Sequence, residues 1–202
     1  MCVIVHKPFD ADMPELDILY SCWEHNPDGA GFAFRDSGSA CFTCIKGIMT
    51  EDSFLDTLYQ IPDSCEIVFH CRIGTSGGYS AQKTHPFPIC KDTTKLNNAF
   101  LTYQQHNEIL FHNGVVGPGT KSLSDTQVLC ASLAGKSVDA VLCALEQEKS
   151  SRFLYINGKD LYRIGDWIPF DGCFYSNAYP IDNNLFDSWE AEDPAYVKTT
   201  IF

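Results

Sequence analysis

Short apolar runs and stretches with helical spacing succeed one another along the chain, and together they predict mixed secondary structure. Apolar runs bounded by glycine, proline or asparagine are typical of strands. The predicted strands cover residues 2–6, 31–34, 40–45, 66–71, 99–103, 108–112, 152–156, 160–164 and 174–176. Apolar residues three and four apart, preceded by a capping residue, are typical of helices. The predicted helices cover residues 13–23, 50–59, 124–134 and 137–149.

The order of these elements indicates how they pack. The strands follow one another as in hairpins, most clearly around Asn157-Gly158. The helices come in separated pairs, and neither a Pro/Gly/Ser-rich linker nor a repeat divides the chain. We therefore expect a single α+β domain over residues 1–202, with antiparallel sheets and helices packed outside them. The last part, from about residue 178 to 202, is expected to be an irregular acidic tail.

Composition narrows the class of protein. The chain has 202 residues, and its apolar runs are far shorter than the roughly 18 residues that span a membrane. Fourteen basic residues against 26 acidic ones give a net charge of −12, so we expect no nucleic-acid partner. No secretory signal peptide precedes the first predicted strand, which favours a cytoplasmic protein. The expected partner is a small or a basic molecule, and the acidic tail is either a solvated surface or a docking face for a basic partner.

Ten cysteines are many for a chain of this length. In a reducing compartment we expect no disulfide framework, and we expect nine of the thiols to be small packing residues. Cys41 and Cys44 have the spacing of a zinc-ligand pair, but no second pair follows them. Residues three apart in a strand also point to opposite faces, so we expect no metal site. Cys2 is a separate case because of its position.

Cys2 is the first candidate for catalysis. Initiator methionine is normally removed before a small residue such as cysteine, which would make Cys2 the mature N-terminus. Its thiol, with an ordinary pKa of about 8.5, would then lie beside an α-amine with a pKa of about 7.7–8.0. A neutral α-amine can accept the thiol proton, directly or through water, so the nucleophile needs no separate histidine. Small residues at position 2 are common, however, and position alone does not establish this role.

Three further segments carry polar groups suited to a ligand. Arg72 ends a predicted strand beside a glycine-rich loop, where it could bind a carboxylate through two hydrogen bonds or be a surface arginine at a turn. Asn113 and Gly114 form either a turn or an oxyanion hole of two N–H donors. Asp125 either caps a helix or accepts hydrogen bonds from a substrate ammonium. Together, Arg72 and Asp125 could hold both charged groups of a free α-amino acid.

Six motifs occur in one order along residues 2–126. They are an N-terminal Cys after Met, Asn26-Pro-Asp-Gly-Ala-Gly31, His70-x-Arg72-x-Gly-Thr75-x-Gly77, Thr84-His-Pro-Phe87, His112-Asn-Gly114 and Ser124-Asp-Thr126. This succession resembles the glutaminase domain of class II glutamine amidotransferases, members of the N-terminal-nucleophile hydrolase superfamily. It is most similar to the compact stand-alone members found in bacteria and bacteriophages. The later segment from Asp171 to Asn177 also resembles the closing strands of those proteins.

The resemblance implies a fold and a reaction. The fold is a four-layer αββα sandwich of two antiparallel sheets with helices outside. Cys2 would attack the side-chain amide of glutamine and form a γ-glutamyl thioester, which releases ammonia and then glutamate. Asn113 and the Gly114 N–H would stabilise the tetrahedral oxyanion. No cofactor or metal is implied.

The resemblance also implies the residues that bind the substrate. Arg72 would bind the α-carboxylate of glutamine, and Asp125 would bind its α-amino group. Thr75 and Ser76 would line the same pocket through hydroxyl and backbone groups. Two further residues would shape the pocket wall beside the nucleophile, namely Asp28 and Gly29.

The chain departs from the family's pattern in two ways. Ser76 stands where many members have histidine. No ammonia-acceptor domain follows the motifs, so a lone glutaminase would supply ammonia to a separate acceptor enzyme. Two alternatives remain: an amidohydrolase acting on another γ-glutamyl compound, and a non-catalytic binding or assembly protein that keeps the fold.

Overall fold

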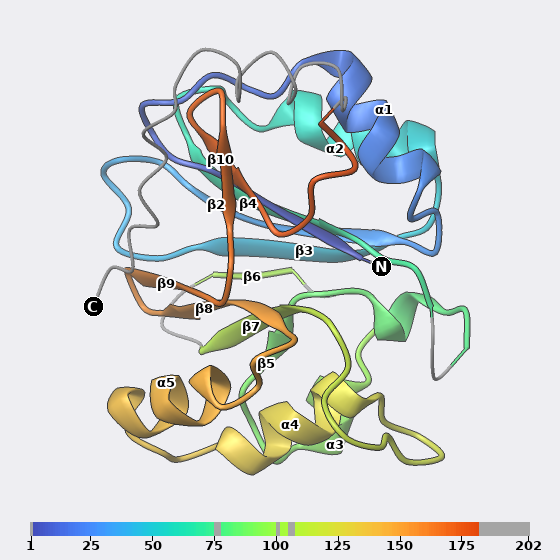
Figure 1. Ribbon diagram of the computed structural model, residues 1–202, viewed down its shortest axis with the longest axis vertical. Helices are drawn as coiled ribbons and strands as arrows, with labels where there is room; N and C mark the ends of the chain where they lie inside the picture. The colour runs from blue at the N-terminus through green and yellow to red at the C-terminus, as the bar shows by residue number, and fades with distance from the viewer. Residues whose placement is uncertain (1, 75–77, 100–101, 105–107, 182–202) are drawn as a thin grey trace.

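Two antiparallel sheets face each other, and helices cover their outer sides (Figure 1). The computed structural model describes residues 2–74, 78–99, 102–104 and 108–181. The larger sheet has the order β10 (Ile168–Phe170), β11 (Cys173–Tyr175), β1 (Val3–Lys7), β4 (Glu66–Cys71), β2 (Ala30–Arg35), β3 (Thr43–Ile48), β6 (Thr102–Gln104). The smaller sheet has the order β5 (Phe87–Pro88), β7 (Ile109–Asn113), β8 (Arg152–Asn157), β9 (Asp160–Ile164). The helices are α1 (Leu16–Glu24), α2 (Glu51–Gln60), α3 (Thr93–Leu96), α4 (Asp125–Leu133), α5 (Val138–Glu146) and the 3-10 turn η1 (Ala81–Lys83).

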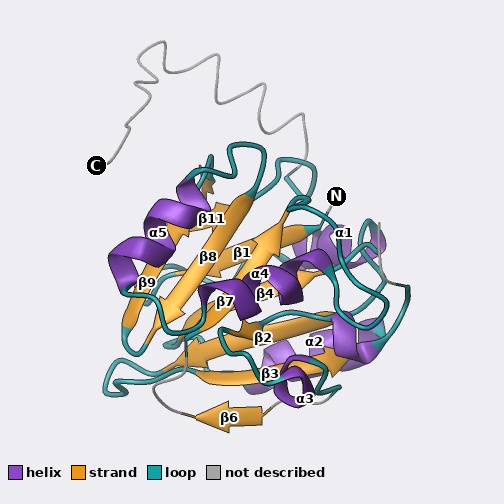
Figure 2. Cartoon of the chain, turned by 90° about the horizontal axis from the view of Figure 1, so that it is seen from below, coloured by secondary structure: helices purple, strands orange, loops and turns teal. Residues whose placement is uncertain are grey.

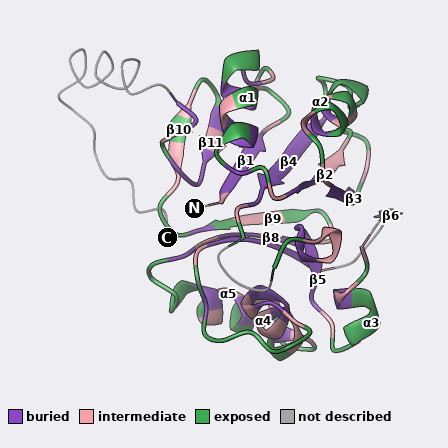
Figure 3. Cartoon of the chain, turned by 90° about the vertical axis from the view of Figure 1, so that its right-hand side faces the viewer, coloured by how far each residue is buried: buried purple, intermediate pink, exposed green. Residues whose placement is uncertain are grey.

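Three buried clusters define the layers. One packs α1 and α2 on the outer face of the larger sheet, with Leu19 and Phe54 among its members. A second lies between the sheets and brings Val68 of β4 against Phe111 of β7. A third packs α4 and α5 on the smaller sheet around Cys130, and these helices lie across its strands in Figure 2. Figure 3 shows the same order, with mostly buried strands between helices that are exposed on their outer sides, although β9 and β10 are largely exposed or half-buried. The α+β class with two antiparallel sheets is confirmed, and the order of layers is compatible with the predicted sandwich.

Local capping explains why two helices begin where the sequence predicts. Thr50 precedes α2 and accepts a hydrogen bond from the Ser53 N–H at 3.3 Å. Ser124 precedes α4 and forms a capping box with Gln127, in which each side chain binds the other residue's N–H. Each of these contacts satisfies an N–H group that the first turn of a helix leaves unpaired. The hairpin predicted at Asn157-Gly158 is also confirmed, since Asn157 pairs with Asp160.

Other predicted boundaries were wrong by a few residues. The first helix begins at Leu16 and not at Met13, because the residue before a proline avoids helical conformation and Pro14 follows Met13. The strand predicted at 40–45 begins at Thr43, after a turn in which Ser39 Oγ donates to the Cys41 carbonyl at 2.8 Å. Four short elements were not predicted, namely η1, β5, α3 and β10. Part of the strand predicted at 99–103 falls on residues outside the described part of the chain.

The first and last described strands are neighbours. β1 is fully buried and lies between β4 and β11, with Val5 opposite Phe69 on one side and Tyr175 on the other. Residues 178–181 contain no helix or strand, and among them Ile181 is buried and Tyr179 packs against the same core as α1. The remainder of the predicted acidic tail, 182–202, falls outside the described residues. Within the described residues, no helix has the length and apolar character needed to cross a membrane.

The ten cysteines differ in how far they are buried. None of the ten forms a disulfide, and six of them are buried: Cys22, Cys44, Cys65, Cys71, Cys130 and Cys173. The prediction that nine are packing residues was wrong for Cys143, which is exposed on α5. Cys41 and Cys90 are half-buried. Cys2 is half-buried as well, just before the first residue of β1.

Candidate functional site

Two segments of the chain form hydrogen bonds with Cys2. Its Sγ accepts a hydrogen bond from the Ile73 N–H at 3.4 Å and lies 3.5 Å from the Ile73 carbonyl oxygen. Its own carbonyl accepts a hydrogen bond from Asn177 Nδ2 at 2.5 Å. The partners come from the loop after β4 and from the segment after β11, the two strands that flank β1. The thiol therefore lies where three neighbouring strands of the larger sheet end.

The surroundings of the thiol act on its pKa in opposite directions. Burial raises the pKa of Cys2, while the Ile73 N–H and the positive charge of Arg72 lower it. The net direction is upward, so the group is mainly a neutral thiol near pH 7. Nucleophilic attack at this position consequently needs a base that removes the proton.

Arg72 and Asp28 lie together beside Cys2. The Arg72 N–H donates to the Gly29 carbonyl, and the Asp28 N–H donates to the Arg72 carbonyl, both at 2.9 Å. The Asp28 carboxylate accepts a hydrogen bond from the Gly74 N–H at 2.6 Å. A Cβ atom at Gly74 would lie 2.8 Å from the Arg72 guanidinium and 3.2 Å from the Asp28 carboxylate, so the missing side chain makes room for both groups. Gly29, at φ +110°, has a similar role, since a Cβ there would lie 2.6 Å from Thr84.

Asn113 ends β7 in the smaller sheet and is buried. Its Nδ2 donates to Ser176 Oγ at 3.0 Å and to the Ser176 carbonyl at 3.3 Å. Its Oδ1 is buried and has no hydrogen-bond partner among the described residues. The Ser176 hydroxyl also accepts the Ile4 N–H at 2.8 Å, two residues after Cys2. One serine thus connects the proposed oxyanion residue on one sheet with the nucleophile-bearing strand on the other.

Gly114 follows with φ +148°, a conformation that favours glycine. A Cβ there would lie 2.4 Å from Ser151 Oγ and 3.0 Å from His112 Nε2. His112 bridges Ser151 Oγ at 3.0 Å and Thr126 Oγ1 at 2.8 Å. Burial lowers the pKa of His112 to about 4, so the imidazole is neutral near pH 7. A buried hydrogen-bond network of the neutral groups His112, Ser151 and Thr126 therefore fixes the Asn113-Gly114 backbone.

Asp125 is the first residue of α4 and is connected to the same turn. Its carboxylate accepts hydrogen bonds from the Val116 N–H at 3.0 Å and from the Thr126 N–H at 2.8 Å. The carboxylate is half-buried, and its charge acts on the pKa of His112. Thr126 Oγ1 also donates to Asp125 Oδ1 at 3.5 Å, so the oxygen with a single donor is Oδ2, which retains a lone pair for a further donor.

The positive charge of Arg72 lowers the pKa of Cys2 and also that of Lys83. Lys83 Nζ in turn donates to Gln127 Oε1 on α4 at 2.8 Å. The predicted substrate residues Arg72, Asp28 and Gly29 therefore lie with Cys2. Asn113 is joined to β1 through Ser176, and Asp125 contacts the turn after Gly114 through the Val116 N–H. Thr75 and Ser76 fall outside the described residues.

Sequence reasoning missed four residues that contact this site. They are Ile73, Ser151, Ser176 and Asn177. Ser176 and Asn177 belong to a segment that the sequence marked only as closing strands, and no local pattern pairs them with residues 2–4 or with Asn113. Only the pairing of β11 with β1 brings Ser176 and Asn177 to the site, and the sequence does not specify that pairing.

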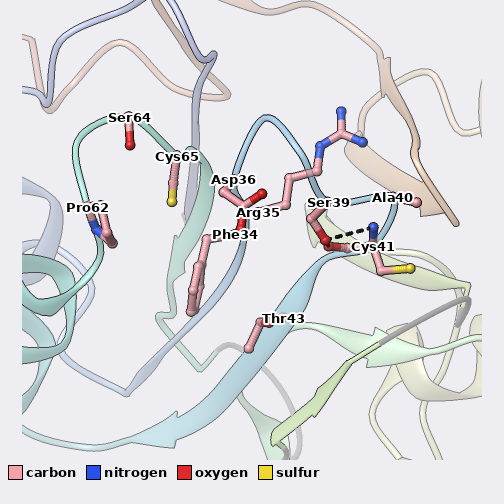
Figure 4. A pocket seen from close by; sticks show the side chains of 10 residues that line it. All are labelled: Phe34, Arg35, Asp36, Ser39, Ala40, Cys41, Thr43, Pro62, Ser64 and Cys65. Atoms are coloured by element: carbon pink, nitrogen blue, oxygen red, sulfur yellow. Dashed lines mark hydrogen bonds between the residues drawn. The ribbon is translucent and has the colours of Figure 1, made fainter.

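A cleft of about 510 Å³ lies elsewhere, between the β2–β3 hairpin and the segment before β4 (Figure 4). Arg35 borders this cleft, and its side chain is bound to Glu66 at 2.6 Å. Cys65 lines the cleft and immediately precedes β4, whereas Cys71 ends that strand near Cys2. Six residues of strand separate the two regions by about 20 Å. The cleft is therefore distinct from the candidate site.

No protein-family model matches the chain, and no curated protein matches it either. In the described part of the chain, no group of three or more His, Cys, Asp or Glu side chains is placed to hold a metal ion. What the arrangement can do chemically follows from the groups themselves. It combines a protonated thiol near an N-terminus, a guanidinium, a carboxylate and an amide beside a glycine N–H.

Proposed function

We propose that the chain is an N-terminal cysteine amidohydrolase that releases ammonia from glutamine, with the fold of the N-terminal-nucleophile hydrolases. The observation that supports this proposal most directly is that polar groups from several segments of the chain contact or act on Cys2. Ile73 hydrogen-bonds the thiol, the Arg72 charge acts on it, and Ser176 and Asn177 connect it to Asn113. The order of the six motifs supports the same reaction.

The raised pKa of the Cys2 thiol determines the first step. After removal of Met1, the free α-amine of Cys2 takes the Sγ proton and becomes an ammonium. The thiolate then attacks the γ-carbonyl carbon of glutamine, which forms the S–C bond and a tetrahedral oxyanion. The α-ammonium returns the proton to the departing nitrogen as the C–N bond breaks, so ammonia leaves and a γ-glutamyl thioester remains. Water attacks the thioester with the same amine as base and releases glutamate and the thiol.

Two backbone-anchored groups stabilise the oxyanion. They are the Asn113 side-chain amide and the Gly114 N–H, which follow each other at the end of β7. Donors that are held in position before the reaction act strongly on a charge that develops in a site with little water. The buried contacts of His112 with Ser151 and Thr126 hold the Asn113-Gly114 backbone in this way, whereas the Asn113 side-chain amide is hydrogen-bonded to Ser176 in the resting chain.

The charged ends of the substrate are bound by residues on two elements. Arg72 forms two hydrogen bonds with the α-carboxylate, for which a planar guanidinium is suited. Asp125 accepts the α-ammonium with the lone pair that its hydrogen bonds leave available on Oδ2. Asp28 and Gly29 form the wall beside Cys2, and the family resemblance assigns Thr75 and Ser76 to the same pocket. Ammonia is supplied to a separate acceptor enzyme.

The test is hydrolysis of glutamine by the purified chain, with ammonia and glutamate measured together. Cys2→Ala removes the nucleophile and is expected to abolish both products. Cys41→Ser and Cys143→Ser are matched controls, since these thiols lie on the distant cleft and on the exposed side of α5. Activity that survives Cys2→Ala contradicts the proposal. Hydrolysis of a γ-glutamyl anilide without hydrolysis of glutamine would favour the second candidate substrate class.

A further inference from the structure

Ser176 occupies a junction between the two sheets. It directly follows β11 and is only 1% exposed. Its N–H donates to the Ile4 carbonyl at 2.9 Å, and its Oγ accepts the Ile4 N–H at 2.8 Å. The next residue, Asn177, donates to the Cys2 carbonyl. Residues 176 and 177 therefore fix the backbone on both sides of Val3, immediately after the nucleophile.

The same serine determines where the Asn113 amide points. Asn113 Nδ2 donates to both oxygens of Ser176, and Asn113 Oδ1 is left buried without a partner in the described part of the chain. An amide in this orientation presents an acceptor at its unbonded end. The proposed reaction instead requires the Asn113 amide to offer a donor to the oxyanion.

The hydrogen bonds of the serine hydroxyl make the opposite orientation possible. Ser176 Oγ accepts two N–H groups, from Ile4 and Asn113, and its own hydrogen has no acceptor among the described residues. A half-turn of the Asn113 amide exchanges Nδ2 with Oδ1 and moves no other group. Ser176 O–H can then donate to Asn113 Oδ1, while the Ile4 N–H still donates to Ser176 Oγ. The exchange replaces the 3.3 Å hydrogen bond to the Ser176 carbonyl with an approach of two oxygens, which the new hydrogen bond from Ser176 O–H must offset, and it frees Nδ2 for the substrate.

We propose that Ser176 is a positioning residue, which holds the Asn113 amide and turns its N–H groups toward the oxyanion during the reaction. The inference rests on the proposed function, because it assigns Ser176 a role in that reaction. In the resting chain both oxygens of Ser176 hold Nδ2. In the acylation step the Ser176 hydroxyl becomes the donor to Asn113 Oδ1, while Ser176 Oγ still accepts the Ile4 N–H. These two successive hydrogen bonds fix the Asn113 amide in the orientation that the reaction needs.

The test is a double-mutant cycle on glutamine hydrolysis. Asn113→Ala is expected to lower kcat by about 100-fold or more, the usual effect of losing an oxyanion donor. Ser176→Ala is expected to lower kcat at least about tenfold while KM changes less than about threefold, because the interaction acts in the transition state. In the Asn113→Ala background, Ser176→Ala is expected to have almost no further effect, since the group that it positions is gone. Ser176→Thr keeps the hydroxyl and is expected to recover most of the activity.

Two controls separate positioning from folding. Ser132→Ala removes an exposed hydroxyl on α4 that donates to Leu129, and it should leave kcat unchanged. The side-chain amide signals of Asn113, identified by their loss in Asn113→Ala, are expected to shift in the ¹⁵N NMR spectrum of Ser176→Ala and not in that of Ser132→Ala. Full activity in Ser176→Ala, additive effects in the double mutant, or unshifted Asn113 signals overturn the inference while the proposed function stands. A wild-type chain without any hydrolase activity overturns both.

Discussion

At the scale of single residues, Cys2 differs from the other thiols in what surrounds its sulfur. Burial raises the pKa of Cys44 to about 12, and burial is the only influence on it. Cys2 is also affected by burial, but an Ile73 N–H and the Arg72 charge favour its thiolate. These two groups stabilise the anion once a base has removed the proton. The local electrostatics of Cys2 therefore favour the thiolate that the proposed reaction needs, which those of Cys44 do not.

Arg72 gives a prediction at the same scale. Arg72→Lys keeps the positive charge but loses the planar group that binds a carboxylate through two hydrogen bonds. We expect KM for glutamine to rise about tenfold or more, with a smaller change in kcat, because the lost binding is shared by substrate and transition state. Steady-state kinetics measures both constants. Arg35→Lys, beside the distant cleft, is the matched control and should leave KM unchanged, and an unchanged KM in Arg72→Lys would rule out carboxylate binding by Arg72.

At the scale of elements, strand β2 depends on a glycine. Gly31 lies at an irregularity in the pairing of β2 with β3, and a Cβ there would lie 1.9 Å from the His85 carbonyl oxygen. Backbone cannot move aside as a flexible side chain can. We expect Gly31→Ala to lower the free energy of unfolding by about 3 kcal/mol or more, the range of overpacked core substitutions.

Urea unfolding at neutral pH measures this effect. Gly38→Ala is the matched control, since a Cβ there meets only Asp36 Oδ1 at 3.4 Å in an exposed turn. The control should change the free energy of unfolding by less than about 1 kcal/mol. Equal stability of the two variants would mean that the His85 segment does not press against β2 as described.

Some of these elements could be predicted from the sequence and others could not. The starts of α2 and α4 were predictable because Thr50 and Ser124 act on residues within the next turn. β5 has two residues and β10 has three, too few for a periodic pattern. Arg72 and Asn113 could be named from motifs, but Ser176 could not. Ser176 accepts a hydrogen bond from Ile4, which is 172 positions away in the sequence, and only the pairing of β11 with β1 brings the two residues together.

At the scale of the whole molecule, three buried histidines lie where the sheets meet the candidate site. The rings of His70 (β4) and His85 lie with their centroids 4.0 Å apart and their planes tilted by 38°, and a ring nitrogen of His70 lies 3.1 Å from the His112 carbonyl oxygen. Burial lowers the pKa of His70 to about 3 and that of His112 to about 4, and it lowers the pKa of His85 well below its usual value. All three are therefore neutral in the folded chain near pH 7.

This arrangement predicts instability in mild acid. In the unfolded chain each histidine has a pKa of about 6.5 and takes up a proton as the pH falls below that value. The folded chain does not take up these protons until the pH approaches 4 or lower. Stability is therefore complete above pH 6.5 and is lost as the pH falls, by about 2 kcal/mol per histidine between pH 7 and 5.

Urea unfolding at pH 7 and pH 5 checks this prediction above the range in which most carboxylates titrate. His70→Gln should reduce the dependence on pH, whereas His25→Gln, at an exposed position, should leave it unchanged. Equal free energies of unfolding at the two pH values would show that the three histidines are not held neutral.

The central claim is that Cys2 is a nucleophile at a free N-terminus, and intact mass spectrometry tests it most directly. The chain is incubated with a diazo-ketone analogue of glutamine, which alkylates a cysteine that attacks it, and its mass is measured before and after. We predict a chain that lacks Met1 and gains one adduct, located on Cys2 by peptide mapping and absent in Cys2→Ala. A chain that keeps Met1 and gains no adduct would contradict the hydrolase and favour a binding protein.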